Sequence, residues 1–77
     1  MTLSARQWTE RFADKLGAAR PSEQEQGWLL ELAGIAAHSS ERTAAPISCW
    51  LAARAGVSPG EARRVARELA EELGADA

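Results

Sequence analysis

The spacing of apolar residues constrains the fold of this chain more than any other feature. From Trp8 to Leu73 they recur at intervals of three or four residues, which is the period of an α-helix, and the alternation typical of β-strands is missing. Serine, proline and glycine separate these stretches at positions where helices begin and end. The sequence therefore predicts an all-α fold, a single small bundle of four helices.

Start signals define the helix boundaries. Ser4–Gln7 and Ser22–Glu25 have the spacing of a capping box, and Ser58–Glu61 combines an N-cap serine, a first-turn proline and a glutamate. Pro46 is expected to open the third helix, because proline is tolerated in a first helical turn. We expect helices over residues 4–16, 22–38, 46–55 and 59–73 in one domain that spans residues 1–77.

A chain of 77 residues has room for one core. We expect at least two of the three tryptophans to meet in that core, since each lies on the apolar stripe of a different helix. Gly34, inside the second helix, is expected to allow a close helix crossing. The predicted core stripes are Trp8, Phe12 and Leu16; Trp28, Leu29, Leu32, Ile35 and Ala36; Ile47, Trp50 and Leu51; and Ala62, Val65, Ala66, Leu69 and Leu73.

Charge and cysteine content restrict the setting of the protein. The formal net charge of −2 argues against a domain that binds by broad neutralisation of nucleic-acid phosphate or an anionic membrane. The single Cys49 cannot form an intramolecular disulfide, which favours a reduced protein. No signal peptide or membrane-spanning stretch is evident. We therefore expect a cytoplasmic protein that does not associate with membranes.

The sequence contains few of the side chains that enzymes commonly use for catalysis. One histidine, one cysteine and no tyrosine leave little from which to assemble a nucleophile, a base and a group that orients them. His38 is expected at a helix C-terminus, where the helix dipole favours a partly protonated ring, and Cys49 as a small buried hydrophobic residue. The sequence predicts no catalytic residue, no metal site and no cofactor.

Residues 48–68 resemble a helix-turn-helix, with Gly56 in the turn. In this alternative the last helix enters a DNA major groove, and its arginines reach phosphates or base edges. Against it, any two helices joined by a short glycine-containing turn give a similar pattern, and glutamates on the same helix repel phosphate. The arginines concerned are Arg63, Arg64 and Arg67.

Residues 29–51 carry a family resemblance. An apolar helix is followed by Ala37-His38, then Arg42, and then Ala44-Ala45-Pro46 at the start of the next helix. This pattern resembles a small actinobacterial domain of unknown function that occurs alone or fused to a molybdenum cofactor guanylyltransferase. Thr43 departs from the family pattern, which usually has a proline there.

The resemblance implies a protein-interaction or accessory role linked to molybdenum cofactor biosynthesis, with the guanylyltransferase as a candidate partner. It makes His38, Arg42 and Pro46 the expected interaction loop. An alternative remains that Pro46 only starts a helix and that Arg42 only interacts with a helix C-terminus. The leading hypothesis is a non-catalytic protein-interaction module; DNA binding and a homo-oligomeric structural role are the alternatives.

Overall fold

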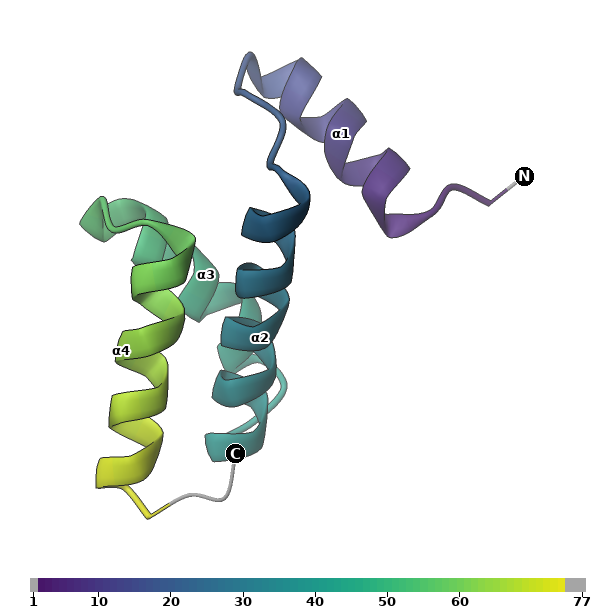
Figure 1. The fold of residues 1–77 in the computed structure, drawn as a ribbon. Coiled ribbons are helices and arrows are strands. Elements are labelled where there is room, and N and C mark those ends of the chain that lie inside the picture. The colour runs from purple at the N-terminus through teal and green to yellow at the C-terminus, as the bar shows by residue number, and fades with distance from the viewer. Residues whose placement is uncertain (1, 75–77) are drawn as a thin grey trace.

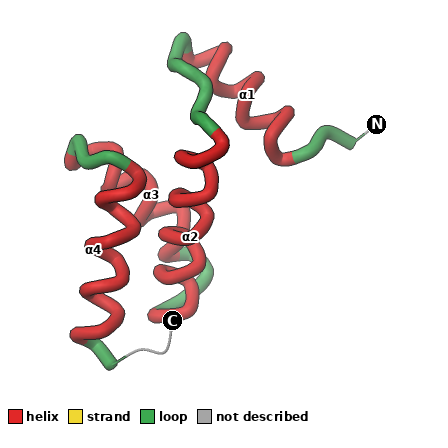
Figure 2. The backbone as a smooth tube through the Cα atoms, in the orientation of Figure 1, coloured by secondary structure: helices red, strands yellow, loops and turns green. Residues whose placement is uncertain are grey.

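The computed structural model describes residues 2–74 and contains, in that range, helices and no strand (Figures 1 and 2). The helices are α1 (Ala5–Leu16), α2 (Glu23–Ser39), α3 (Ala44–Ala55) and α4 (Pro59–Glu72). The predicted all-α fold of four helices is confirmed. Helix α3 begins at Ala44, two residues before the predicted start at Pro46. Proline is tolerated inside this first turn because the N–H that it lacks would have no partner within the helix.

Local signals end and begin these helices as the sequence predicts. The Ser4 hydroxyl accepts a hydrogen bond from the Gln7 amide N–H at 3.0 Å, and the Ser4 amide donates to the Gln7 side chain at 2.9 Å. Ser22–Glu25 forms the same reciprocal capping box. Gly17 and Gly56 follow α1 and α3 with φ of 71° and 76°, a left-handed conformation that favours glycine.

Helix α2 is the centre of the fold. It packs against both α3 and α4, whereas α3 and α4 contact each other little. No Cα atom of α1 lies within 8 Å of a Cα atom of the other described helices, and Figure 1 shows α1 projecting from the N-terminal end of α2. The described chain is therefore a three-helix body with α1 outside it.

The core of this body is small. Leu32 and Ile35 on α2 are buried, as the predicted stripe requires, and their buried counterparts on α4 are Ala62 and Ala70. Alanine has little side chain to separate two helix axes, so α2 and α4 can approach closely. The core therefore depends on two large residues of α2 packed among small ones.

Helices α2 and α4 approach closely where the Trp28 ring lies against Gly60. A Cβ atom placed on Gly60 would lie 3.3 Å from ring atoms of Trp28, so the indole covers the place that any larger residue would fill. A Cβ atom placed on Gly34 would have no atom within 4 Å. The close crossing predicted at Gly34 is therefore wrong, and it occurs at Gly60 instead.

Most large apolar residues outside α2 are exposed, which corrects the predicted core. Helices α3 and α4 turn their smaller residues toward α2, and α1 does not pack closely against any other described helix, so the large residues of these three helices have little to cover them. Two of the tryptophans, Trp8 and Trp50, are exposed, and only Trp28 is half-buried. The exposed residues are Trp8, Phe12, Leu16, Ile47, Trp50, Leu51, Val65, Leu69 and Leu73.

We predict that Gly60→Val lowers the free energy of unfolding by about 1–3 kcal/mol, because the new side chain must displace the Trp28 ring. Gly27→Val is the matched control, because it introduces the same side chain at an exposed helical glycine. Nothing lies within 4 Å of a Cβ atom at Gly27, so that change should leave stability unchanged or raise it by less than about 1 kcal/mol through helix propensity alone. Urea unfolding followed by circular dichroism measures both, and equal stability of the two variants would contradict the Trp28–Gly60 contact.

Candidate functional site

The three residues of the predicted interaction loop are all exposed. His38 lies in the last turn of α2, Arg42 in the turn that follows, and Pro46 in the first turn of α3. Within residues 2–74 no ion pair or side-chain hydrogen bond joins any of them to another group. They therefore form an accessible polar surface, but the structure does not bring them together as a built site.

The arginines of the DNA-binding alternative are held by carboxylates. Arg63 donates to Glu31 of α2 at 2.9 Å, and Arg67 approaches the same oxygen atom at 3.4 Å. Arg64 pairs with Glu61 and Glu68 on its own helix. A DNA phosphate would have to replace these carboxylates, and the acidic residues that remained would repel it.

A groove between α3 and α4 is lined almost wholly by apolar residues. It has a volume of about 270 Å³, and Ser48 is the only polar residue among those that line it. Leu32 of α2 and alanines 52, 62 and 66 are among the more buried of its lining residues and form its floor, and the larger exposed side chains border it. These larger residues are Leu51 on α3, Val57 in the turn, and Val65 and Leu69 on α4.

The two rims of the groove differ in charge. Glu61, Glu68 and Glu72 fall at helical spacing on the flank of α4 beside Val65 and Leu69, so the α4 rim is acidic. On the α3 side, the Arg54 guanidinium lies over the exposed Trp50 ring at 5.0 Å from its centroid, a cation–π contact. The groove is thus an apolar channel with an acidic rim along one side.

Helix α1 presents a second exposed apolar face. The rings of Trp8 and Phe12 stack with their centroids 5.0 Å apart, and Leu16 follows one turn later on the same face. Arg11 and Lys15 border this face and, with Leu3, Trp8 and Phe12, line a shallow hollow. This face is an apolar ridge with a basic edge.

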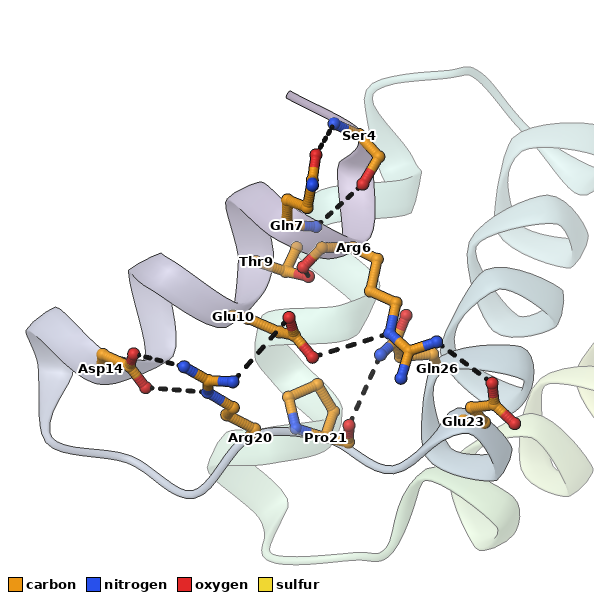
Figure 3. A network of polar contacts seen from close by, with 10 residues as sticks. All are labelled: Ser4, Arg6, Gln7, Thr9, Glu10, Asp14, Arg20, Pro21, Glu23 and Gln26. Atoms are coloured by element: carbon orange, nitrogen blue, oxygen red, sulfur yellow. Dashed lines mark hydrogen bonds and ion pairs between the residues drawn. The ribbon is translucent and has the colours of Figure 1, made fainter. Parts of the chain in front are cut away.

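Ion pairs set the direction of α1 (Figure 3). Arg20, in the connection to α2, donates two hydrogen bonds to Asp14, at 3.0 and 2.7 Å. Arg6 bridges to Glu23 at the start of α2, with 3.1 Å between nitrogen and oxygen. Because both contacts lie on the polar side of α1, the helix is held with its apolar ridge away from the body.

Two carboxyl groups titrate below their ordinary range. The hydrogen bonds from Arg20 lower the pKa of Asp14, opposed by desolvation and assisted by the charge of Arg20. Arg64 lowers the pKa of Glu61 in the same way. Both carboxyls are therefore firmly ionised near neutral pH, where they act as fixed partners of the arginines.

The groups most often used for catalysis are not assembled within the described residues. Burial raises the pKa of the Cys49 thiol, which disfavours the reactive thiolate. Among residues 2–74 no group of three or more His, Cys, Asp or Glu side chains is placed to hold a metal ion. None of the helices described is long and apolar enough to cross a membrane.

Sequence reasoning placed the functional surface in the His38–Pro46 loop and missed the α3–α4 groove. Val65 and Leu69 carry an ordinary amphipathic pattern, which predicts a core position. Only the orientation of α3 and α4 relative to α2 leaves them uncovered. One feature of the sequence could have indicated the groove. The apolar stripe of α4 contains both small and large residues, and it is too wide for a single neighbouring helix to cover.

Comparison with known families gives one result. The family model described as "Domain of unknown function (DUF6457)" matches residues 2–77, almost the whole chain. No curated protein and no solved structure matches the chain. The family description names no activity, ligand or partner, so any function has to be argued from the surfaces described above.

We predict that Arg20→Ala raises the pKa of Asp14 to the ordinary value of about 3.9. The pKa of Asp14 is lowered in the folded chain, so the stabilisation from this pair is present above the unfolded-state pKa and is lost as pH falls through the folded-state pKa. Side-chain carboxyl chemical shifts measured by NMR against pH test this. Arg64→Ala is the control, since it should raise the pKa of Glu61 and leave Asp14 unchanged. An unaltered Asp14 in Arg20→Ala would contradict the pairing.

Proposed function

This chain belongs to the DUF6457 family of domains of unknown function, and we propose that it is a non-catalytic protein-interaction module that binds a helix in its α3–α4 groove. The observation that carries the proposal is the groove itself, an apolar channel open to solvent and bordered by Leu51, Val65 and Leu69. Contiguous exposed apolar surface of this kind marks interaction sites in soluble proteins. Helix-in-groove docking is one of the recurring modes of peptide recognition.

The rims define the chemistry of the partner helix. Its apolar side must carry residues at i, i+4 and i+8, because such residues form one ridge along a helix. The edge of the helix that faces α4 should be basic, since Glu68 and Glu72 border that side of the groove. Charge complementarity of this kind sets orientation and association rate more than affinity.

We propose that this function belongs to the cytoplasm and to molybdenum cofactor biosynthesis. The first part rests on the single Cys49, which has no partner for an intramolecular disulfide. The second rests on the Ala37-His38, Arg42 and Ala44-Ala45-Pro46 pattern and its resemblance to domains fused to the guanylyltransferase. The proposed role is accessory, with the guanylyltransferase as the protein partner, and the exposed His38, Arg42 and Pro46 as a second, polar contact.

We predict that the tagged chain retains a molybdenum cofactor guanylyltransferase from a native extract treated with nuclease. The Leu69→Glu variant should retain much less of this enzyme. A carboxylate in the groove would be desolvated by the bound helix without a partner, which costs several kcal/mol. Quantitative mass spectrometry of the retained proteins measures the loss. Glu71→Gln, an exposed change on the side of α4 away from the groove, should retain the partner at the wild-type level.

The loop and the DNA-binding alternative give different outcomes in the same experiment. Loss of the guanylyltransferase with His38→Ala or Arg42→Ala but not with Leu69→Glu would move the interface to the loop and contradict the groove. Retention of protected DNA fragments that disappear with Arg64→Ala, without any guanylyltransferase, would replace the proposal with DNA binding. Wild-type retention by Leu69→Glu and both loop variants would exclude both surfaces.

A further inference from the structure

We infer that the helix bound in the α3–α4 groove is α1 of a second copy of this chain, so that two copies exchange their N-terminal helices. The inference rests on the proposed function, because it concerns the same groove. In the dimer α1 of the second copy occupies that groove, so a helix of the guanylyltransferase has to displace α1 in order to bind there. It joins two features of one chain that a single copy leaves uncovered: the apolar ridge of α1 and the apolar groove of the body.

The first argument is the amount of exposed surface. The chain exposes 5928 Å², whereas a folded monomer of 8.2 kDa is expected to expose about 4,500 Å². The excess of about 1,400 Å² is larger than the roughly 800 Å² that each partner buries in a standard stable interface. A single copy is thus extended for its mass, and the excess is sufficient for a second copy to cover.

The second argument is shape. Trp8, Phe12 and Leu16 lie at i, i+4 and i+8, so their ridge extends for about 12 Å along α1. The α4 side of the groove runs from Ala62 to Leu69, a length of about 10 Å. The alanine floor leaves room for large side chains such as these aromatic rings. The ridge and the groove therefore match in length and in size of residue.

The third argument is charge. Arg11 and Lys15 border the ridge, and within residues 2–74 neither has an ion-pair partner. The α4 rim offers Glu61, Glu68 and Glu72, and of these Glu72 has no ion pair in the described part of the chain. When the ridge enters the groove in the direction that turns Arg11 and Lys15 toward α4, the basic edge of α1 lies against this acidic rim. Opposite charges along an apolar contact favour this pairing over contact of two α1 ridges or of two grooves.

The fourth argument concerns why α1 does not fill its own groove. Arg6 on α1 is paired with Glu23 at the start of α2 (Figure 3). Ala5 and Thr9, which adjoin the ridge on α1, line a hollow with Pro21 and Gln26, so this flank already faces the chain's own α2. The ridge residues beside it stay 49–64% exposed, so the ridge is available to another copy. Two such contacts related by a two-fold axis close the assembly as a dimer.

Sedimentation equilibrium of the full chain tests this inference. We expect a mass of twice 8.2 kDa for the wild type, and a single-chain mass for Phe12→Glu on the ridge and for Leu69→Glu in the groove. These side chains are 49% and 52% exposed in one copy, so the substitutions leave the three-helix body intact, which far-ultraviolet circular dichroism checks. Trp50→Glu is the matched control: this residue is 58% exposed and lies outside the groove, so the variant should keep the double mass.

Mixing the two single-chain variants separates exchange from other arrangements. Phe12→Glu retains an intact groove and Leu69→Glu retains an intact ridge, so an equimolar mixture should recover the double mass through one of the two contacts. A mixture that keeps the single-chain mass, or a double mass in either variant alone, would overturn the inference. So would a wild-type chain that keeps the single mass at about 100 μM, far above the Kd of a micromolar complex.

These outcomes separate the inference from the proposed function. A single-chain wild type that still retains the guanylyltransferase through Leu69 would leave the groove as a binding site and give it another occupant. A dimer that follows the expected pattern, together with guanylyltransferase retention that does not depend on Leu69, would keep α1 in the groove and move the partner elsewhere.

Discussion

The contact between α2 and α4 sets the character of the whole molecule. It is made by Leu32 and Ile35 on one side and by Ala62 and Ala70 on the other, with Trp28 lying over Gly60 at one end. Small residues on α4 allow this close approach, but they also mean that α4 turns its alanines inward. Its larger side chains, Val65 and Leu69, are left facing outward. The same choice of residues that forms the core thus creates the surface groove.

A core this small couples stability to binding. Native domains are stable by only about 5–15 kcal/mol, and short chains lie at the low end of that range because they bury less of their surface. Any ligand that binds only the folded state adds stability, about 2.7 kcal/mol at a concentration one hundred times its Kd. A helix seated between Leu51 and Leu69 would therefore act as a missing part of the core. This links the fold directly to the proposed interaction function.

The sequence predicted local structure well because its signals are local. Ser4, Ser22 and Ser58 begin helices, and Gly17 and Gly56 end them, through hydrogen bonds and backbone angles that involve only neighbouring residues. The stripe of α2 was also correct, since this helix has neighbours that cover it. Amphipathic spacing identifies an apolar face but not the helix that covers it. Hence Trp8 and Phe12 were assigned to the core, whereas the only buried residue of α1 is Ala13.

Contacts between residues far apart in the sequence were the second feature that the sequence did not predict. Glu31 reaches Arg63 and Arg67 from a different helix, and nothing in the spacing of the last helix indicates that these two arginines are already engaged. The close approach was expected at Gly34, in the middle of a helix, whereas Gly60 was accounted for by its place in a helix start. Both errors concern which faces of two helices meet, a property of the assembled chain that the pattern within one helix does not contain.

In α1, weak ion pairs set the orientation of the helix, whereas burial of its apolar residues supplies the larger free energy. Its ion pairs, Arg20 with Asp14 and Arg6 with Glu23, lie on exposed side chains, and such pairs contribute about 0.2–1 kcal/mol each and weaken with salt. They help to fix the direction of a helix whose only other contacts with the described chain are few. Burying Trp8, Phe12 and Leu16 is worth more, since each such side chain contributes about 1.5–3 kcal/mol when fully covered. The ion pairs therefore direct the ridge outward, and the surface that the ridge meets determines its affinity.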